Sequence, residues 1–498
     1  MLFNSLQFLI FFPIVLLVYF IIPKKIRYIW LLVASYYFYM CWNAKYALLI
    51  LFSTLVTYLS GLFIDKISHS ETEERVKKTR MKLCVAASFV LNLGVLCYFK
   101  YTNFLMETLN KAFNLIHIEL NLPVFDILLP VGISFYIFQA LSYTMDIYRG
   151  EVQAEKNFLR YALFVSFFPQ LVAGPIERSK NLLSQLAKPV KPEYDKMVNG
   201  FMLMLWGFFM KIVVADRIAL FVDSAYNDTA SFGGWYLIVA SVLFAFQIYC
   251  DFGGYSCIAK GTAQMLGIEL MENFNAPYTS LSVREFWGRW HISLSTWFRD
   301  YLYIPLGGNR KGKIRKHINK MIVFLVSGLW HGASWSFVIW GGLHGLYQVI
   351  GEILEPVRNK LVKVLRLNRE SIGHKLAKAL CTFILVDFAW IFFRSQSMTR
   401  SKEVLSAMIN VRNPWIFFDD SLYNCGLDRK NFTLMLACIL LLIVVDMFNR
   451  AGIRLREVIL KQDWWFKWVV IALSITAILL FGVWGSQFSE ASFIYFQF

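Results

Sequence analysis

The chain has 498 residues, of which 57% are apolar, and its mean hydropathy is +0.51. Soluble domains contain about 45–50% apolar residues, so this composition excludes an ordinary water-soluble globular protein. The formal net charge is +17, but the basic residues occur in short loops between apolar runs, which is typical of cytoplasmic loops in membrane proteins rather than of a nucleic-acid surface. The eight cysteines have no CxxC spacing, so neither a metal site nor a disulfide framework is expected.

Apolar segments that approach the length of a membrane span occur from one end of the chain to the other. We count about eleven of them, judged against the roughly 20 residues that a helix needs to cross the hydrocarbon core. The clearest are 6–22, 28–43, 47–64, 83–99, 376–395, 432–449 and 466–485. We therefore expect an all-α polytopic membrane protein with both termini outside. It should form a single domain, 1–498, with N-terminal helices in 1–127, core segments in 128–350 and C-terminal helices in 351–498.

Three further apolar stretches, 128–150, 167–180 and 284–310, are too short or too interrupted for simple spans. Irregular backbone is tolerated at membrane depth only where protein buries it or where it lines a wet cavity. These stretches therefore predict re-entrant or irregular segments around a central channel or active site.

The basic stretches on both sides of residues 321–350 are incompatible with a single membrane crossing by these residues. The preceding stretch, 310–320, carries six basic residues and no acid, and the following one, 358–378, carries seven against one Glu. Both should be cytoplasmic, so the chain between them must make an even number of passes. The small residues that begin with Gly332, directly after His331, supply the break. The helix from Met321 to His331 spans about 16 Å, close to half of a core of about 30 Å, which predicts that His331 lies near the bilayer midplane.

Of the seven histidines, His331 is the strongest candidate for chemistry. Placing an ionisable residue at membrane depth costs free energy, so such a residue is expected to have a function. The structural alternative is a histidine that donates a hydrogen bond to a backbone carbonyl inside a helix bundle. His291 would share a helix face with Trp287 and Ser295, as part of a cavity wall or of an interfacial helix. His344 lies between glycines, which favours packing. Solvated positions are expected for His69, His117, His317 and His374.

Charged residues also interrupt apolar stretches at Lys211, Asp216, Arg217 and Asp251. Structural ion pairs are the expected explanation for Lys211, Asp216 and Arg217, although Lys211 and Asp216 are five positions apart, which leaves their direct pairing open. Absent motifs narrow the chemistry further. The sequence has no GxxxxGK[ST], GxSxG, HExxH or H-x4-D pattern, so an ATP motor, a serine-hydrolase nucleophile or a metalloprotease is not indicated. A sheltered neutral imidazole remains, which suits a general base for an attacking alcohol or a nucleophile that forms an acyl-imidazole.

Long ordered motifs resemble the membrane-bound O-acyltransferase family, and in particular its bacterial alginate O-acetyltransferase branch. They are "FWGRWHISLSTWFRDYLYIPLGGNR" and "LWHGASWSFVIWGGLHG", together with "SFYIFQALSYTMDIYRG", "FFPQLVAGPIER", "KIVVADR" and "FIYFQF". The resemblance covers nearly the whole chain. It implies that His331 corresponds to the essential histidine of the family and His291 to its second histidine site. One residue departs from the pattern, because Cys257 replaces the second Asp of the usual "DF[SG]GYSDIA".

The same resemblance implies a ring of helices around a thin core in a bacterial cell membrane. Funnels from the two faces would meet near His331, and Trp290, Ser295, Trp330 and Ser334 would line them. An acetyl group would pass from a cytoplasmic thioester, either acetyl-CoA or a loaded acyl-carrier protein, to a hydroxyl outside. A separate extracytoplasmic transferase of the SGNH type, or the polysaccharide itself, would receive it, and no bound cofactor is expected.

Other functions stay open at this stage. A D-alanyl group could be transferred to teichoic acid instead of an acetyl group to a polysaccharide. A transporter or flippase of lipid-linked sugars would need no thioester donor and would survive loss of His331. A purely structural partner in an export complex would tolerate changes at both His331 and His291.

Overall fold

The computed structural model describes residues 1–118, 122–188, 190–484 and 494. Within these residues every regular element is a helix and none is a strand, which confirms the all-α prediction. Seven of the described helices are long and apolar enough to cross a membrane. The number rises to eight if α14 (Trp335–Ile353) and α15 (Glu355–Val364), which bend by 52° at their junction, form one span.

The sequence predicted about eleven spans, judged against a span length of roughly 20 residues. Fewer helices of the structure are long and apolar enough to cross a membrane. The helices α1 (Leu6–Ile21), α2 (Arg27–Met40) and α5 (Ile133–Tyr148) have 16, 14 and 16 residues. Protein buries α5 along almost its whole length, whereas α20 (Trp464–Phe481) is largely exposed. Apolar sequence alone does not fix the length of a helix, so the sequence count included 6–22 and 28–43, whose helices fall short of a full span.

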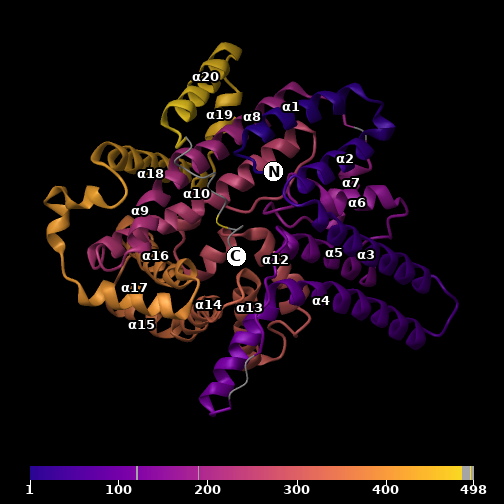
Figure 1. The fold of residues 1–498 in the computed structure, drawn as a ribbon, viewed down its shortest axis with the longest axis horizontal. Coiled ribbons are helices and arrows are strands. Elements are labelled where there is room, and N and C mark those ends of the chain that lie inside the picture. Colours follow the sequence, from indigo (N-terminus) through magenta and orange to yellow (C-terminus); the bar gives the residue numbers. More distant parts are fainter. Residues whose placement is uncertain (119–121, 189, 485–493, 495–498) are drawn as a thin grey trace. The chain divides into compact units, whose positions relative to one another are not determined.

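The chain folds as two compact units. Unit 1 comprises Met1–Met204 and Ile258–Met271, and unit 2 comprises Leu205–Cys257 and Glu272–Phe498. The helices of unit 1 are coloured indigo to magenta in Figure 1. In addition to α1, α2 and α5 they are α3 (Ala47–Ser68), α4 (Glu74–Leu115), α6 (Phe158–Ser166) and α7 (Ser179–Leu186). Two helices, α8 (Tyr194–Phe208) and α10 (Trp235–Met265), contribute residues to both units.

In unit 1, α3 packs against α4 and α5, and α2 packs against α6. Residues 167–178 connect α6 to α7 without a helix and are almost entirely buried, as expected for an irregular core segment. The buried Glu177 carboxylate accepts hydrogen bonds from the backbone N–H of Met271 at 2.5 Å and from Asn181 Nδ2 at 2.8 Å. The stretch 128–150 is more regular than expected, because α5 begins directly after Gly132, whose φ is 74°.

Unit 2 contains the remaining helices. They are α9 (Asp216–Asn227), α11 (Val283–Arg289), α12 (Ile292–Phe298), α13 (Gly312–His331), α14, α15, α16 (Ile372–Ser395), α17 (Met398–Asn410), α18 (Arg429–Arg450), α19 (Leu455–Leu460) and α20. Two π-helical segments, Phe209–Ala215 before α9 and Arg299–Tyr303 after α12, interrupt the α-helical geometry. The stretch 284–310 is therefore broken into short pieces, as its sequence predicted.

The first π-helical segment explains an ion pair with an unusual spacing. Residues five apart do not face each other on an α-helix, but the wider π turn brings i and i+5 into register. Lys211 Nζ accordingly lies 2.9 Å from Asp216 Oδ1, and also 2.6 Å from Asp251 Oδ1. The other oxygen of Asp251 accepts the backbone N–H of Ile494 at 2.8 Å. The ion pair expected for Lys211 and Asp216 is thus confirmed and extends to Asp251, whereas Arg217 donates to the backbone carbonyl oxygens of Val213 and Phe481 instead.

The helices α13 and α14 form a hairpin and lie side by side (Figure 1). Their contact is close because glycines face the partner backbone. A Cβ atom on Gly341 would lie 2.2 Å from the carbonyl oxygen of Phe324. The chain between the helices is Gly332–Ser334, so the predicted break after His331 is confirmed. The depth of His331 in the bilayer stays a prediction.

Candidate active site

His331 is the last residue of α13, and an aromatic enclosure surrounds its imidazole. Gly332, in extended conformation with φ −158°, ends the helix directly after it. The ring centroid lies 4.9 Å from Trp330, 4.9 Å from Trp340 and 5.6 Å from Phe393. Only 4% of His331 is exposed. The helix end therefore places one imidazole in a buried setting that aromatic side chains enclose.

His291 lies between α11 and α12 in a left-handed backbone conformation, with φ 44° and ψ 52°. For a residue other than glycine this conformation costs about 1–2 kcal/mol, so the surrounding structure must stabilise it. The residue is fully buried, and its ring lies 4.7 Å from Phe252. The expectation that His291 shares one helix face with Trp287 and Ser295 is wrong, because the helix ends before His291 and a new helix begins after it.

The two histidines come together although 40 positions separate them in sequence. Their ring centroids are 6.2 Å apart with an interplanar angle of 62°. Trp330 contacts both, with its ring 5.9 Å from His291. This spacing allows one small group, such as an acyl carbonyl with its attacking hydroxyl, to contact both imidazoles. Such a group would react in an enclosure from which aromatic side chains exclude water, and this protects an activated acyl donor from hydrolysis.

The four residues expected to line a channel occupy different environments. Trp330 contacts both histidines, whereas Trp290 is completely buried and stacks 5.4 Å from Phe286. Ser295 is half-buried, and its hydroxyl donates to the carbonyl oxygen of Trp290 at 3.4 Å. Ser334 is the N-cap of α14 and accepts the backbone N–H of Ser336 at 3.3 Å. A channel-lining role stays a prediction for all four.

Sequence reasoning missed the aromatic partners Trp340, Trp390 and Phe393. Trp340 and Trp390 stack at 5.7 Å, and Phe393 lies 5.2 Å from each of them. The density of aromatic residues in "WSFVIW" and "FAWIFF" was the available signal. His344 is a packing residue, as expected, because its Nδ1 accepts a hydrogen bond from Trp287 Nε1 at 3.2 Å.

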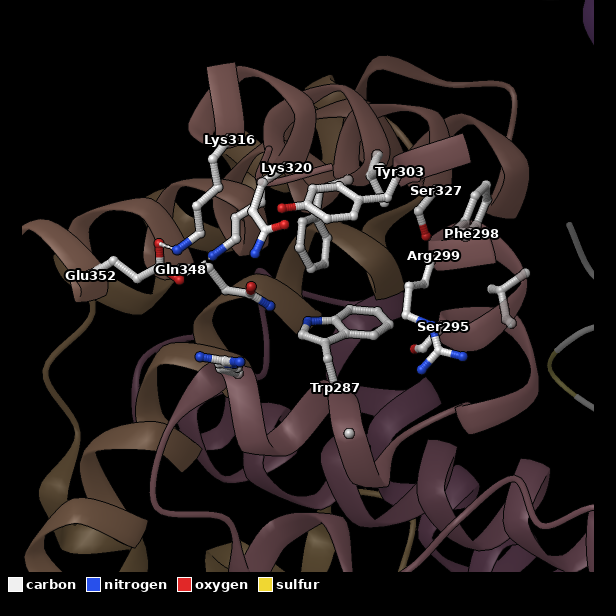
Figure 2. Close-up of a pocket in the computed structure, with 16 residues that line it drawn as sticks. Trp287, Ser295, Phe298, Arg299, Tyr303, Lys316, Lys320, Ser327, Gln348 and Glu352 are labelled. Atoms are coloured by element: carbon white, nitrogen blue, oxygen red, sulfur yellow. Dashed lines mark hydrogen bonds and ion pairs between the residues drawn. The ribbon is translucent and has the colours of Figure 1, made fainter. Parts of the chain in front are cut away.

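A cavity of about 400 Å³ opens between the segments that carry the histidines. Its apolar wall includes Trp287, Phe298 and Phe324, and Ser295 also lines it. Ser327 contributes as well, and it precedes His331 by four residues, so both lie on one face of α13. Figure 2 shows Trp287 between two polar groups, with Lys316, Lys320 and Glu352 on one side and Arg299 with Ser295 on the other.

The polar part of this cavity is strongly basic. Four cations line it, namely Arg284, Arg299, Lys316 and Lys320, and the carboxylate that it contains is Glu352. Glu352 forms an ion pair with Lys316 at 2.8 Å and another with Lys320, both visible in Figure 2. The sequence positions of these four cations did not predict that they line one cavity. The folded chain gathers them into a site suited to an anionic ligand.

Comparison with known proteins adds a family and several relatives. Residues 154–362 match the model of MBOAT, the membrane-bound O-acyltransferase family. The protein named Probable alginate O-acetylase AlgI of Azotobacter vinelandii is 37% identical over 414 residues, which cover 82% of this chain and 78% of that protein. The Peptidoglycan O-acetyltransferase of Helicobacter pylori is 33% identical, with coverages of 82% and 80%. The Teichoic acid D-alanyltransferase of Bacillus subtilis is 28% identical, with coverages of 53% and 68%.

Proposed function

The chain belongs to the membrane-bound O-acyltransferase family and is a multi-pass O-acyltransferase, and from this premise we propose that it exports acetyl groups for polysaccharide O-acetylation. An acetyl group would leave a cytoplasmic thioester, pass through the bacterial cell membrane and reach hydroxyl groups outside. The extent of similarity favours acetyl over D-alanyl as the cargo. The acetyl-transferring relatives match over 82% of the chain, whereas the D-alanyl-transferring relatives match over 53%.

One observation carries the assignment of the site: two imidazoles lie 6.2 Å apart inside a tryptophan enclosure at the break of a helical hairpin. In the proposed reaction His331 removes the proton as a hydroxyl oxygen attacks the thioester carbonyl carbon. The new C–O bond forms, the C–S bond breaks, and the imidazolium returns the proton to the departing thiolate. His291 contacts the same reacting group. Transfer through an acyl-imidazole is the other route, and it would leave labelled acetyl on the protein before acceptor is added.

The basic cavity supports a donor that carries phosphate. Its volume of about 400 Å³ falls within the ordinary range of ligand pockets. Lys316 and Lys320 belong to the stretch 310–320, which the basic-loop rule assigns to the cytoplasm. Acetyl-CoA fits this charge and this side of the membrane, and so does the phosphopantetheine arm of an acyl-carrier protein. We propose that the donor enters here and extends along α13 towards His331.

The acceptor side follows from the same proposal. The short apolar helices and the irregular segments would enclose a central channel that reaches the outer face. There an extracytoplasmic SGNH-type transferase, or the polysaccharide directly, would receive the acetyl group. The chain would use the donor as a substrate and need no resident cofactor.

The test uses the full chain, purified in detergent, with radiolabelled acetyl-CoA and a soluble oligosaccharide acceptor. We expect His331→Ala to lower acetyl transfer about 10³-fold while the protein remains folded by size-exclusion chromatography and thermal unfolding. His344→Gln is the matched control, because it changes another buried histidine that packs near the site but should retain most turnover per folded molecule.

Two results would overturn parts of this proposal. Full activity in His331→Ala would remove the site assignment and would match a transporter of lipid-linked sugars instead. Transfer only from a D-alanyl-loaded carrier protein, with acetyl-CoA inert, would replace the cargo and retain the site.

A further inference from the structure

We propose that Asn273 is a positioning residue that caps α12 from outside the helix and thereby holds His291 in its working conformation. The inference rests on the proposed function, in which His291 contacts the reacting group beside His331. Asn273 lies in the segment between α10 and α11, at a distance of 18 positions from His291 in sequence.

The first N–H groups of α12 need hydrogen-bond acceptors from outside the helix. The first N–H groups of a helix have no partner within it, and a Ser, Thr, Asp or Asn at the N-cap usually accepts one of them through its side chain. Here His291 occupies the N-cap position, and its side chain makes no capping hydrogen bond. The imidazole is therefore not used for capping, and the N–H groups of Ile292 and Ser293 need acceptors from elsewhere.

Asn273 supplies both acceptors. Its backbone carbonyl oxygen accepts the N–H of Ile292 at 3.0 Å. Its side-chain Oδ1 accepts the N–H of Ser293 at 3.3 Å and the Ser293 hydroxyl at 2.6 Å. One residue therefore caps the two residues that directly follow the left-handed turn at His291.

The amide nitrogen of the Asn273 side chain also makes a hydrogen bond. Asn273 Nδ2 donates to the hydroxyl of Ser256 on α10 at 3.2 Å. Asn273, Ser256 and Ser293 are all buried, with exposures of 1%, 4% and 0%, so water does not compete for these bonds. Ser256 lies one turn beyond Phe252, whose ring contacts the His291 imidazole at 4.7 Å. The same helix thus anchors the asparagine and supports the ring that the asparagine positions.

This geometry explains why a non-glycine residue persists at φ 44° between two short helices. The carbonyl and amide of Asn273 fix the chain after His291. Before it, the N–H of Asn275 donates to the carbonyl oxygen of Arg289 at 3.0 Å. Loss of the amide would let the turn relax towards an ordinary backbone conformation and move the imidazole away from His331.

The first experiment compares Asn273→Ala, Asn273→Asp and Asn275→Ala in detergent, with labelled acetyl-CoA as the donor. Asn273→Ala should lower kcat on the order of 10²-fold, because a displacement of about 1 Å can cost that much, while the KM for acetyl-CoA stays within about twofold. Asn273→Asp keeps the acceptors for Ser293 and should restore most of kcat. Asn275→Ala is the matched control, because Asn275 holds Arg289 through backbone atoms, and it should behave as wild type.

A wild-type kcat in Asn273→Ala, or equal losses in the alanine and aspartate variants, would overturn the inference. If Asn273→Ala does not fold, Ser293→Ala serves in its place, because it removes the 2.6 Å hydroxyl bond and retains the amide of Asn273. A fall in kcat at constant KM supports the inference, and unchanged kcat rejects it.

The second experiment does not depend on acetyl transfer, so it separates this inference from the proposed function. Glycine tolerates positive φ without strain, so in His291→Gly the turn no longer needs the hydrogen bonds from Asn273 to keep its conformation. Asn273→Ala should therefore lower the melting temperature less in the His291→Gly background than in the wild-type chain, as a double-mutant cycle would measure. Equal losses in both backgrounds would make Asn273 an ordinary packing residue, even if His331 proves catalytic.

Discussion

The two segments that present histidines to the site are built in different ways. The hairpin of α13 and α14 consists of two regular helices whose glycines allow close backbone contact, and His331 lies at the end of the first helix. The segment Asn273–Phe298 contains two helices of seven residues each, and His291 lies in a strained turn between them. The position of His331 thus depends on local sequence, whereas that of His291 depends on hydrogen bonds from residues distant along the chain.

Two histidines in one site should therefore respond differently to changes in the residues around them. A change in the hairpin acts through helix packing and should disturb folding. A change around His291 acts through a few buried hydrogen bonds and should disturb geometry before it disturbs the fold. The predictions below test this contrast.

The largest expected effect comes from removing the imidazoles themselves. His331→Ala should lower kcat about 10³-fold and His291→Ala about 10²-fold, in line with the contribution of a positioned acid or base. Acetyl transfer per folded molecule, measured with labelled acetyl-CoA, gives both values. A larger loss for His291→Ala than for His331→Ala would reverse the assigned roles.

An alanine at Gly341 should destabilise the packing of α13 against α14, whereas an alanine at Gly342 should not. Gly341→Ala places a Cβ atom 2.2 Å from the Phe324 carbonyl oxygen, whereas the same atom on Gly342 meets only Leu325 at 3.6 Å. Gly341→Ala should therefore destabilise the protein by about 3 kcal/mol, and Gly342→Ala should be neutral or stabilising by up to about 1 kcal/mol. Thermal unfolding in detergent measures both. Equal tolerance at the two positions would contradict the close packing of α13 and α14.

Charge reversal in the cavity should affect donor binding and leave both histidine segments intact. Lys320→Glu should raise the KM for acetyl-CoA about tenfold at low salt, and the effect should shrink as salt screens the charges. Lys313→Glu, which makes the same charge change at an exposed position of α13 outside the cavity, is the control. An equal rise in KM for both variants would indicate general attraction by the basic loop rather than a defined donor site.

The smallest expected effect is a gain of affinity. Glu352 forms ion pairs with Lys316 and Lys320, so an anionic donor must compete with its carboxylate for these two lysines. Glu352→Gln should lower the KM for acetyl-CoA about threefold, which corresponds to about 0.6 kcal/mol. Steady-state kinetics at fixed salt measure the change. A higher KM would show instead that Glu352 orients the lysines for the donor.

Much of the site could be predicted from the sequence because its signals are local. The basic flanks on both sides of 321–350 required a hairpin, and the small residues after His331 located its break. The spacing of Lys211 and Asp216 left their pairing open, because an α-helix does not bring residues five apart together. A π turn resolves this, and such a turn has no reliable signature in sequence.

The class of protein, the break after His331 and the family could all be predicted from the amino-acid sequence, because composition, periodicity and ordered motifs are properties of the linear chain. The left-handed turn at His291, the capping of the next helix by Asn273 and the cavity lined by four cations became visible in the folded chain alone. Hydrogen bonds and charge clusters between residues distant along the chain depend on folded distances, and no local pattern encodes those distances.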